Sequence, residues 1–208
     1  MNELNNINQT LNKKTALEMV EWALEFSQED MIVSTNFGPH EAVILHLATQ
    51  VYPNIPVLWA DSGYNTAKTY QFALNLIDKL KLNIKIYVPA TTALYRDAIY
   101  GGIPPIEKKE IHDKFTEEVK LEPFKRGLAE LKPKVWLTAI RKEQTNFRQS
   151  LDIASKGQNN MLKISPVFHW TEKELETYLT ENNLPMEKTY FDPTKVLDKR
   201  ECGLHPNL

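Results

Sequence analysis

The residues with the most evident chemistry lie at the end of the chain, in the segment KRECGLHPNL, which holds the only cysteine of the 208 residues. Lys199 and Arg200 precede Cys202, and His205 follows it three positions later. Cationic neighbours lower the pKa of a thiol and so raise the fraction of thiolate, which is the reactive form. The segment has two interpretations, an incidental free thiol or a nucleophile, and its surroundings favour the nucleophile.

A polar turn in VSTNFGPHEAV leads from a predicted strand into a predicted helix through Ser34, Thr35, Asn36, Phe37 and Gly38. Hydroxyl groups, a glycine and the free N–H groups of a helix N-terminus together make an anion-binding site. The turn has neither the Gly-Lys-Ser/Thr sequence nor the second glycine of a Walker loop. On its own, it is as compatible with an ordinary capped strand–helix junction as with an anion site.

A second polar segment, WADSGYNT, places Asp61 and Ser62 directly after another predicted strand. Asp61 has two interpretations: its carboxylate accepts hydrogen bonds from a nucleoside, or it holds its own loop by an Asx turn. The residues alone slightly favour the loop role.

Basic residues gather after the fourth predicted strand, in AIRKEQTNFRQS, which contains Arg141, Lys142, Gln144 and Arg148. Arginine presents a planar fork to phosphate and sulfonate oxygens, whereas lysine acts as a point charge. Such a cluster at a strand end favours anion binding, and a solvated charged face is the alternative. Further basic residues that could add to the same field are Lys120, Lys195, Lys199 and Arg200. These features suggest the hypothesis of a thiolate that attacks a highly anionic small molecule.

Composition narrows the classes of function. The chain has 25 basic and 27 acidic residues and a net charge of -2, which gives no reason to expect a nucleic-acid or membrane partner. One cysteine can form neither an internal disulfide nor the four-ligand site of an iron–sulfur cluster, and the histidines show no metal-ligand spacing. The amino end lacks the apolar run of a signal peptide, and no stretch approaches the length of a transmembrane helix. We therefore expect a soluble cytoplasmic protein without a metal site.

Short apolar, β-branched runs alternate with segments of helical periodicity. The predicted strands are residues 31–35, 55–60, 84–88, 135–139 and 161–164, and the predicted helices are 15–26, 40–52, 66–82, 121–131 and 171–179. This alternation predicts a largely parallel α/β sheet, in which ligands bind beyond the carboxyl ends of the strands. The polar segments described above follow those ends. Residues 89–119 are the least regular part, and they are either a loop over the functional edge or a plain surface excursion.

Taken together, these segments resemble the phosphoadenosine phosphosulfate (PAPS) reductase family, the sulfonucleotide reductases of assimilatory sulfate reduction. The resemblance runs from about residue 15 to the end, through VSTNFG, ADSGY, DKLKLNIKIY, VKLEPFKRGLAEL, WLTAIRKEQTNFR and KRECGLH in the family's order. It implies an adenine nucleotide α-hydrolase-like (PP-loop) three-layer sandwich with a mainly parallel five-stranded sheet. It also implies a nucleotide-binding reductase domain at 1–188 and a mobile tail at 189–208 that carries the catalytic cysteine.

The resemblance also implies roles for individual residues. Cys202 matches the family's nucleophile, and His205 matches the histidine that supports the closed tail. Ser34 to Gly38 match the modified PP-loop, while Asp61 and Ser62 fall in the second nucleotide-binding loop. The residues expected to bind the substrate are Ser34, Thr35, Asn36, Phe37, Gly38, Asp61, Ser62, Lys120, Arg141, Lys142, Gln144 and Arg148.

The implied reaction gives the terminal thiol two partners. The Cys202 thiolate attacks the sulfate sulfur of PAPS to form S-sulfocysteine, and adenosine 3′,5′-bisphosphate leaves. A thiol of thioredoxin or glutaredoxin then attacks the Cys202 sulfur and releases sulfite. No cofactor is expected, and a homodimer is compatible with the resemblance.

Several alternatives stay open at the level of sequence. The usual bacterial adenosine phosphosulfate (APS) reductases add cysteines that bind a [4Fe–4S] cluster, which this chain lacks, but a cluster-free enzyme could still accept APS. A PP-loop enzyme that uses ATP would carry a Ser-Gly-Gly-x-Asp-Ser loop, and a non-enzymatic nucleotide-binding or redox-sensing module would release no sulfite. The segment between Lys188 and Lys199 is also shorter than in family members and lacks their extra arginines. Either Lys195, Lys199 or Arg200 substitutes for them, or recognition of the 3′-phosphate is weakened.

Overall fold

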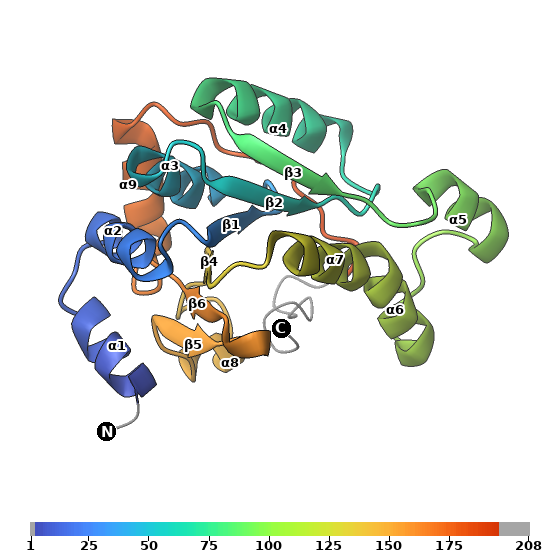
Figure 1. Cartoon of the computed structure of the whole chain (residues 1–208). Helices are drawn as coiled ribbons and strands as arrows, with labels where there is room; N and C mark the ends of the chain where they lie inside the picture. Colours follow the sequence, from blue (N-terminus) through green and yellow to red (C-terminus); the bar gives the residue numbers. More distant parts are fainter. Residues whose placement is uncertain (1–2, 196–208) are drawn as a thin grey trace.

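The computed structural model of the chain describes residues 3–195, so Lys199, Arg200, Cys202 and His205 lie outside the described residues. The described part forms a six-stranded sheet with the order β3-β2-β1-β4-β6-β5 (Figure 1). The strands are β1 (Met31–Thr35), β2 (Pro56–Ala60), β3 (Asn83–Tyr87), β4 (Val135–Leu137), β5 (Ala154–Lys156) and β6 (Leu162–Ile164). Every neighbouring pair is parallel except β5 with β6. The predicted mainly parallel α/β sheet is confirmed.

The expected count of five strands is wrong, because β5 adds a sixth strand at one edge. β5 has the sequence Ala-Ser-Lys, and a run this short and polar lacks the apolar pattern that marks a strand. Its outer edge is held by Asn8 of helix α1 (Glu3–Leu11). The Asn8 side-chain amide donates to the Ala154 carbonyl at 3.0 Å, and the Ala154 N–H donates to Asn8 Oδ1 at 2.8 Å. One asparagine thus supplies the backbone partner that a further strand would supply.

The helices include the five that periodicity predicts. These five are α2 (Ala16–Ser27), α3 (Glu41–Val51), α4 (Ala67–Leu80), α7 (Glu122–Leu131) and α9 (Glu172–Glu181). Thr15 and Thr171 begin α2 and α9 with complete capping boxes, and the Thr66 hydroxyl caps α4. The irregular stretch after β3 is largely helical, with α5 (Ala93–Tyr100) and α6 (Lys109–Thr116). A short helix, α8 (Asn146–Gln149), and a 3₁₀ turn, η2 (Gln158–Asn160), follow β4.

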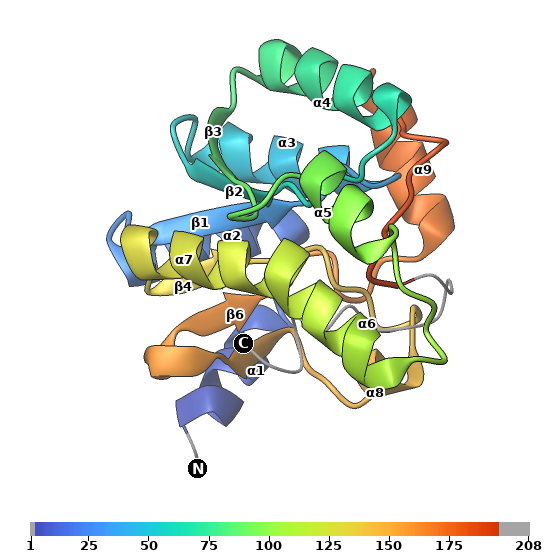
Figure 2. The same cartoon turned by 90° about the vertical axis from the view of Figure 1, so that its right-hand side faces the viewer.

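Helix α6 continues into α7 through a π-helical segment, η1 (Glu117–Leu121). Figure 2 shows α6 and α7 as one nearly continuous rod along the sheet. A π-helical turn shifts the register of the side chains that follow it and is frequent at functional sites. Lys120 lies in this segment, and its side chain is buried.

Two apolar layers enclose the sheet. Residues at alternate strand positions, such as Val33 and Val57, belong to the larger core beneath α2, α3, α4 and α9. Their neighbours Ile32 and Leu58 face the other side and pack with Phe124 of α7. Because side chains alternate between the faces of a strand, one sheet supplies both cores. The result is the expected three-layer α/β/α sandwich.

The strand order reverses direction between β1 and β4. The chain runs outward from β1 through β2 to β3, then returns to place β4 on the other side of β1. In open α/β sheets, such a reversal leaves a crevice at the carboxyl ends of the two strands, and ligands bind there. Thr35 ends β1, and Thr138 directly follows β4, so these residues mark the expected position of the site. Within residues 3–195, the structure contains no helix that is long and apolar enough to span a membrane.

Candidate active site

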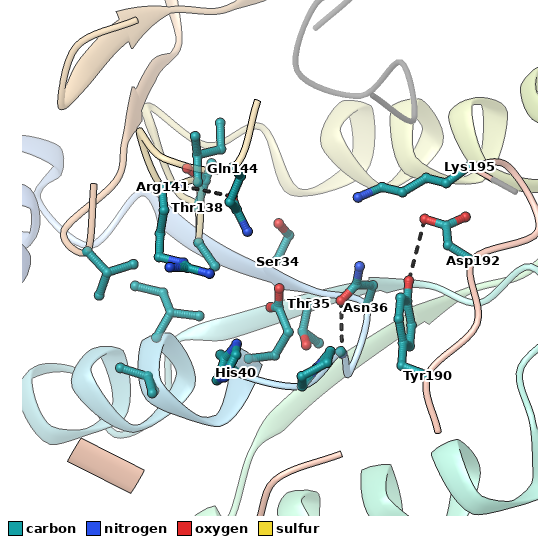
Figure 3. Close-up of a pocket in the computed structure, with 18 of the residues that line it drawn as sticks. Ser34, Thr35, Asn36, His40, Thr138, Arg141, Gln144, Tyr190, Asp192 and Lys195 are labelled. Carbon is teal, nitrogen blue, oxygen red and sulfur yellow. Dashed lines mark hydrogen bonds between the residues drawn. The ribbon is translucent and has the colours of Figure 1, made fainter. Parts of the chain in front are cut away.

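A cavity of about 410 Å³ opens at this reversal point (Figure 3). Its floor is the turn from β1 into α3, and one wall is the segment after β4. The other wall combines η1 with the segment that follows α9. The predicted binding residues that line it are Ser34, Thr35, Asn36, Gly38, Lys120, Arg141, Gln144 and Arg148. Four chain regions that are distant in sequence therefore meet around one polar space.

The turn after β1 is held by its own side chains. Thr35 Oγ1 accepts a hydrogen bond from the Phe37 N–H, and Asn36 Oδ1 accepts one from the Gly38 N–H, both at 2.9 Å. A Cβ atom on Gly38 would lie 2.9 Å from Asn36 Oδ1, so a larger residue here would displace the Asn36 side chain that holds the turn. Ser34 Oγ accepts a hydrogen bond from Trp136 Nε1 at 2.8 Å. This bond fixes the Ser34 oxygen at the cavity floor and leaves its hydroxyl proton available to donate.

Phe37 lies beneath the turn and does not line the cavity. Its ring is fully buried and packs edge-on against Trp59 at a centroid distance of 4.8 Å. Its backbone has a positive φ of 52°, which turns the chain sharply toward α3. Phe37 therefore acts as an apolar anchor for the loop, whereas its neighbours present polar groups to the cavity.

Gln144 connects the two arginines of the wall after β4. Its Oε1 accepts a hydrogen bond from the Arg141 N–H at 3.0 Å and another from the Arg148 guanidinium. Both arginine side chains are largely buried, and the Arg141 guanidinium also pairs with Glu143. Lys142, between them in sequence, is exposed and absent from the cavity wall. The motif thus directs Arg141 and Arg148 inward and Lys142 outward.

A buried ion pair forms the opposite wall. Lys120 Nζ lies 2.5 Å from Asp192 Oδ2, and both side chains are almost inaccessible to solvent. The Thr194 hydroxyl and N–H donate to Asp192 Oδ1 at 2.6 and 3.0 Å. Burial acts to raise the pKa of Asp192, but the charge of Lys120 and the hydrogen bonds from Lys120 and Thr194 outweigh it and lower this pKa to about 2. Asp192 is therefore ionised at neutral pH and neutralises Lys120.

Lys195 reaches into the cavity from the same side (Figure 3). It also lines an adjoining cavity of about 540 Å³ together with Arg141, Gln144 and Arg148. Lys195 therefore belongs to both spaces and brings a cation from the C-terminal segment to the arginine wall. Sequence analysis identifies Lys195 as a residue that could add to the basic field and as one of three candidates to replace missing arginines.

Asp61 and Ser62 do not line either cavity. Asp61 Oδ1 accepts hydrogen bonds from the Gly63 N–H at 3.0 Å, from Asn65 Nδ2 at 2.8 Å and from the Tyr70 hydroxyl at 2.9 Å. Burial, followed by this hydrogen bond to Asp61, raises the pKa of Tyr70 to about 12. The observed contacts of Asp61 are those of the loop role.

Other cavity-lining residues were not identified from sequence. The polar ones are His40, Glu41, Thr138, Tyr190 and Asp192. Glu41 was accessible to prediction because it lies in the first turn of the helix after the anion-binding turn, whereas Thr138 fell inside the predicted strand 135–139, which ends earlier, at Leu137. Asp192 carried no such signal, since its place depends on contact with Lys120, which lies 72 residues earlier.

Glu41 is the acidic group of the cavity floor. Burial raises its pKa to about 7, although a hydrogen bond with Thr35 and the charges of Lys195, Arg148 and Lys120 all act to lower it. At neutral pH this carboxyl group is therefore close to half ionised.

His40 also lies at the cavity floor, where its Nε2 atom is buried without a hydrogen-bond partner among the described residues. Burial and the nearby charge of Arg141 lower its pKa, against the effect of Glu172 and Glu176. One side-chain nitrogen or oxygen atom from each of these three residues, His40, Glu172 and Glu176, lies within 4.8 Å of the others. Sequence spacing did not reveal this group, because His40 precedes α3 and the two glutamates lie on α9.

Comparison with known proteins gives consistent similarities. Residues 30–194 match the family model described as the phosphoadenosine phosphosulfate reductase domain. The chain is 37% identical to the phosphoadenosine 5′-phosphosulfate reductase of a Synechococcus species, and the match covers 97% of both chains. It is also 37% identical to the enzyme of that name from Vibrio cholerae, with 97% of this chain and 88% of that one covered.

Solved structures share the fold. The phosphoadenylyl-sulfate reductase of Candida auris, a phosphate complex, matches with a TM-score of 0.76 at 22% identity, and 89% of each chain is covered. The FMN adenylyltransferase of Candida glabrata in complex with ATP matches with a TM-score of 0.57 at 16% identity, over 82% of this chain and 55% of that one. The PP-loop class of α/β fold expected from the sequence is thereby confirmed.

Proposed function

The chain belongs to the phosphoadenosine phosphosulfate (PAPS) reductase family, and we propose that it reduces PAPS to sulfite and adenosine 3′,5′-bisphosphate. The observation that carries this proposal is the cavity at the β1/β4 reversal. A hydroxyl-rich turn at a helix N-terminus faces Arg141, Arg148 and Lys195 across a space of about 410 Å³. Such an arrangement suits a small molecule with several negative charges.

Cys202 is the proposed nucleophile, and it follows the cavity-lining Lys195 by seven residues in the sequence. Its thiolate attacks the sulfate sulfur, an S–S bond forms, and the bond between that sulfur and the phosphate oxygen breaks. Adenosine 3′,5′-bisphosphate leaves with the electron pair of the broken bond. The cations of the cavity wall stabilise the charge that develops on the leaving phosphate. His205 is the proposed support for the closed tail.

A dithiol protein of the thioredoxin or glutaredoxin type supplies the two electrons. One of its thiolates attacks the Cys202 sulfur and displaces sulfite, and its second thiol then releases Cys202 as thiolate. The products are a disulfide in the reductant and a regenerated enzyme, so sulfur is reduced at the expense of two thiols. This chemistry suits the cytoplasm, where such reductants are kept reduced. It requires no iron–sulfur cluster, for which one cysteine would be insufficient.

APS is the second candidate substrate. It differs from PAPS by the absence of the 3′-phosphate. Among the described residues of the segment after α9, Lys195 is the basic residue that lines the cavity. Because a single lysine gives weaker phosphate recognition than a pair of arginine forks, discrimination against APS rests on few groups.

Sulfite release from each nucleotide tests the proposal. We expect the purified protein with thioredoxin to release sulfite from PAPS, and Cys202→Ser to release none. Turnover of APS at an equal or greater kcat/KM would reassign the substrate to APS. Tight nucleotide binding without sulfite from either substrate would show that the chain is a binding module.

A further inference from the structure

We infer that Glu41 is a nucleotide-binding residue that acts through its proton. Without a nucleotide, its carboxyl group faces the basic side chains of the cavity, and it takes up a proton when an anionic nucleotide binds. This inference rests on the proposed function for the identity of the nucleotide. It adds a group to which neither the family's motifs nor the sequence assigned a role.

Glu41 lines the cavity in which we propose that the anionic nucleotide binds. It is the first residue of α3, directly beyond the turn that forms the cavity floor, and its side chain is partly exposed to the cavity. Its carboxyl group hydrogen-bonds with Thr35, whose oxygen also accepts the Phe37 N–H. Because the hydrogen bond with Thr35 lowers the pKa of Glu41, it stabilises the ionised carboxylate, to which the Thr35 hydroxyl donates. This bond holds the carboxyl group among the residues proposed to contact the nucleotide.

Charged groups face Glu41 from three different elements. They are Lys120 on η1, Arg148 on α8 and Lys195 in the segment after α9. Lys120 is already neutralised by Asp192, and on the neighbouring wall Arg141 is paired with Glu143. An ionised Glu41 places a negative charge beside these cations, at the edge of the space that a ligand would occupy. A phosphate or sulfate that enters beside it is repelled unless the carboxyl group becomes neutral.

The protonation behaviour of Glu41 is compatible with this role. Its pKa of about 7 means that one proton is gained or lost near neutral pH. A bound anion counteracts the three cations that hold this pKa down, so the pKa rises further in the complex. Once protonated, the carboxyl group changes from an acceptor into a hydrogen-bond donor for an anionic oxygen. Binding and proton uptake are thus coupled.

Isothermal titration calorimetry of the full-length protein with adenosine 3′,5′-bisphosphate tests the inference. This product needs no reaction at Cys202, and phosphate groups with a pKa near 6 change little in charge above about pH 7.5. Titrations from pH 7 to 9 in two buffers of different ionisation enthalpy count the protons taken up. For the wild type, we expect uptake approaching one proton and an affinity that falls by up to about tenfold per pH unit above pH 7.

Glu41→Gln removes the titrating group and keeps the shape and a hydrogen-bonding side chain. We expect this variant to take up almost no proton and to bind the nucleotide at least about tenfold more tightly than the wild type at pH 8.5. Glu41→Ala serves as a second variant with the same expected loss of proton uptake. Glu25→Gln is the matched control, because it makes the same charge change at an exposed carboxylate on α2, outside the cavity lining.

The outcomes separate this inference from the proposed function. Equal proton uptake in the wild type and Glu41→Gln would overturn the inference, and loss of uptake in His40→Gln instead would assign the proton to the neighbouring histidine. Weaker binding by Glu41→Gln at pH 8.5 would also overturn it. Failure of every variant and of the wild type to bind the nucleotide would contradict the proposed function, and the inference would fall with it.

Discussion

The carboxyl group of Glu41 connects the stability of the fold to pH in the neutral range. Its pKa is about 7 in the folded protein, against an ordinary value of 4.5. Between these two values the folded state holds a proton that the unfolded chain has lost. Stability therefore falls as the pH rises through this window and stays constant with respect to this group above it. The ionised Glu41 carboxylate therefore lowers the stability of the fold at neutral and alkaline pH, at a position where we propose that its proton serves nucleotide binding.

Glu41→Gln should therefore stabilise the protein at alkaline pH. We expect a gain in the free energy of unfolding of roughly 1–3 kcal/mol at pH 8, which disappears as the pH falls toward the ordinary glutamate pKa. Urea unfolding at pH 4.5, 6 and 8 measures the trend. Glu25→Gln should show no comparable trend, and a gain for Glu41→Gln that is the same at all three pH values would refute the explanation.

Asp61 provides a second test at the residue scale, because its contacts are those of a loop-forming side chain. Asp61→Ala removes the acceptor of the Gly63 N–H, the Asn65 amide and the Tyr70 hydroxyl. We expect a loss of about 1–3 kcal/mol in unfolding free energy, with a smaller effect on affinity for adenosine 3′,5′-bisphosphate. Unchanged stability combined with a large loss of affinity would instead favour the nucleoside-binding role.

At the scale of elements, the Lys120–Asp192 pair joins η1 to the segment after α9. These two groups are separated by 72 residues in sequence, and they meet only because the π-helical turn and the C-terminal segment converge at the cavity wall. The pair fixes the base of the segment that leads toward Cys202. Its contribution to stability depends on the charge of Asp192, whose pKa is lowered from 3.8 to about 2.

Asp192→Asn should be strongly destabilising, because it removes the carboxylate that pairs with the buried Lys120 charge. We expect a loss of about 3–5 kcal/mol at pH 7, whereas Lys120→Met with Asp192→Leu should recover much of it. In the wild type, the contribution of Asp192 is fully present above pH 3.8 and is lost as the pH falls toward 2. Chemical unfolding of the three proteins measures this, and a loss below about 1 kcal/mol for Asp192→Asn would show that the pair is not needed.

At the scale of the whole molecule, local sequence patterns predict the sheet but not every contact at its edge. The apolar runs identify β1, β2, β4 and β6, because burial on both faces demands continuous apolar residues, and they also identify the partly exposed edge strand β3. The polar strand β5 depends on the Asn8 side chain from the other end of the chain. No local pattern encodes such a long-range contact. Helices α5 and α6 were missed because short helices near glycine and proline carry a weak periodic signal.

The candidate site, like the sheet, was predictable from sequence where it depends on strand ends and not where it depends on long-range contacts. Residues in the turn after β1 and in the segment after β4 lie at strand ends, so topology alone brings Ser34, Thr35, Arg141 and Arg148 together. Sequence could not show that Lys142 points away. The buried position of Asp192 beside Lys120 is set by tertiary packing rather than by local pattern. The proposed tail and its thiol extend past the described residues and stay predictions.

Intact-protein mass spectrometry of the reduced enzyme after mixing with PAPS, without thioredoxin, tests the central claim most directly. The proposed mechanism predicts a mass gain of one sulfonate per chain, absent in Cys202→Ser and discharged as sulfite when thioredoxin is added. The same experiment with APS shows which nucleotide forms the adduct faster. An unmodified mass with both nucleotides, in a protein that binds them tightly, would contradict the proposal that Cys202 is the nucleophile.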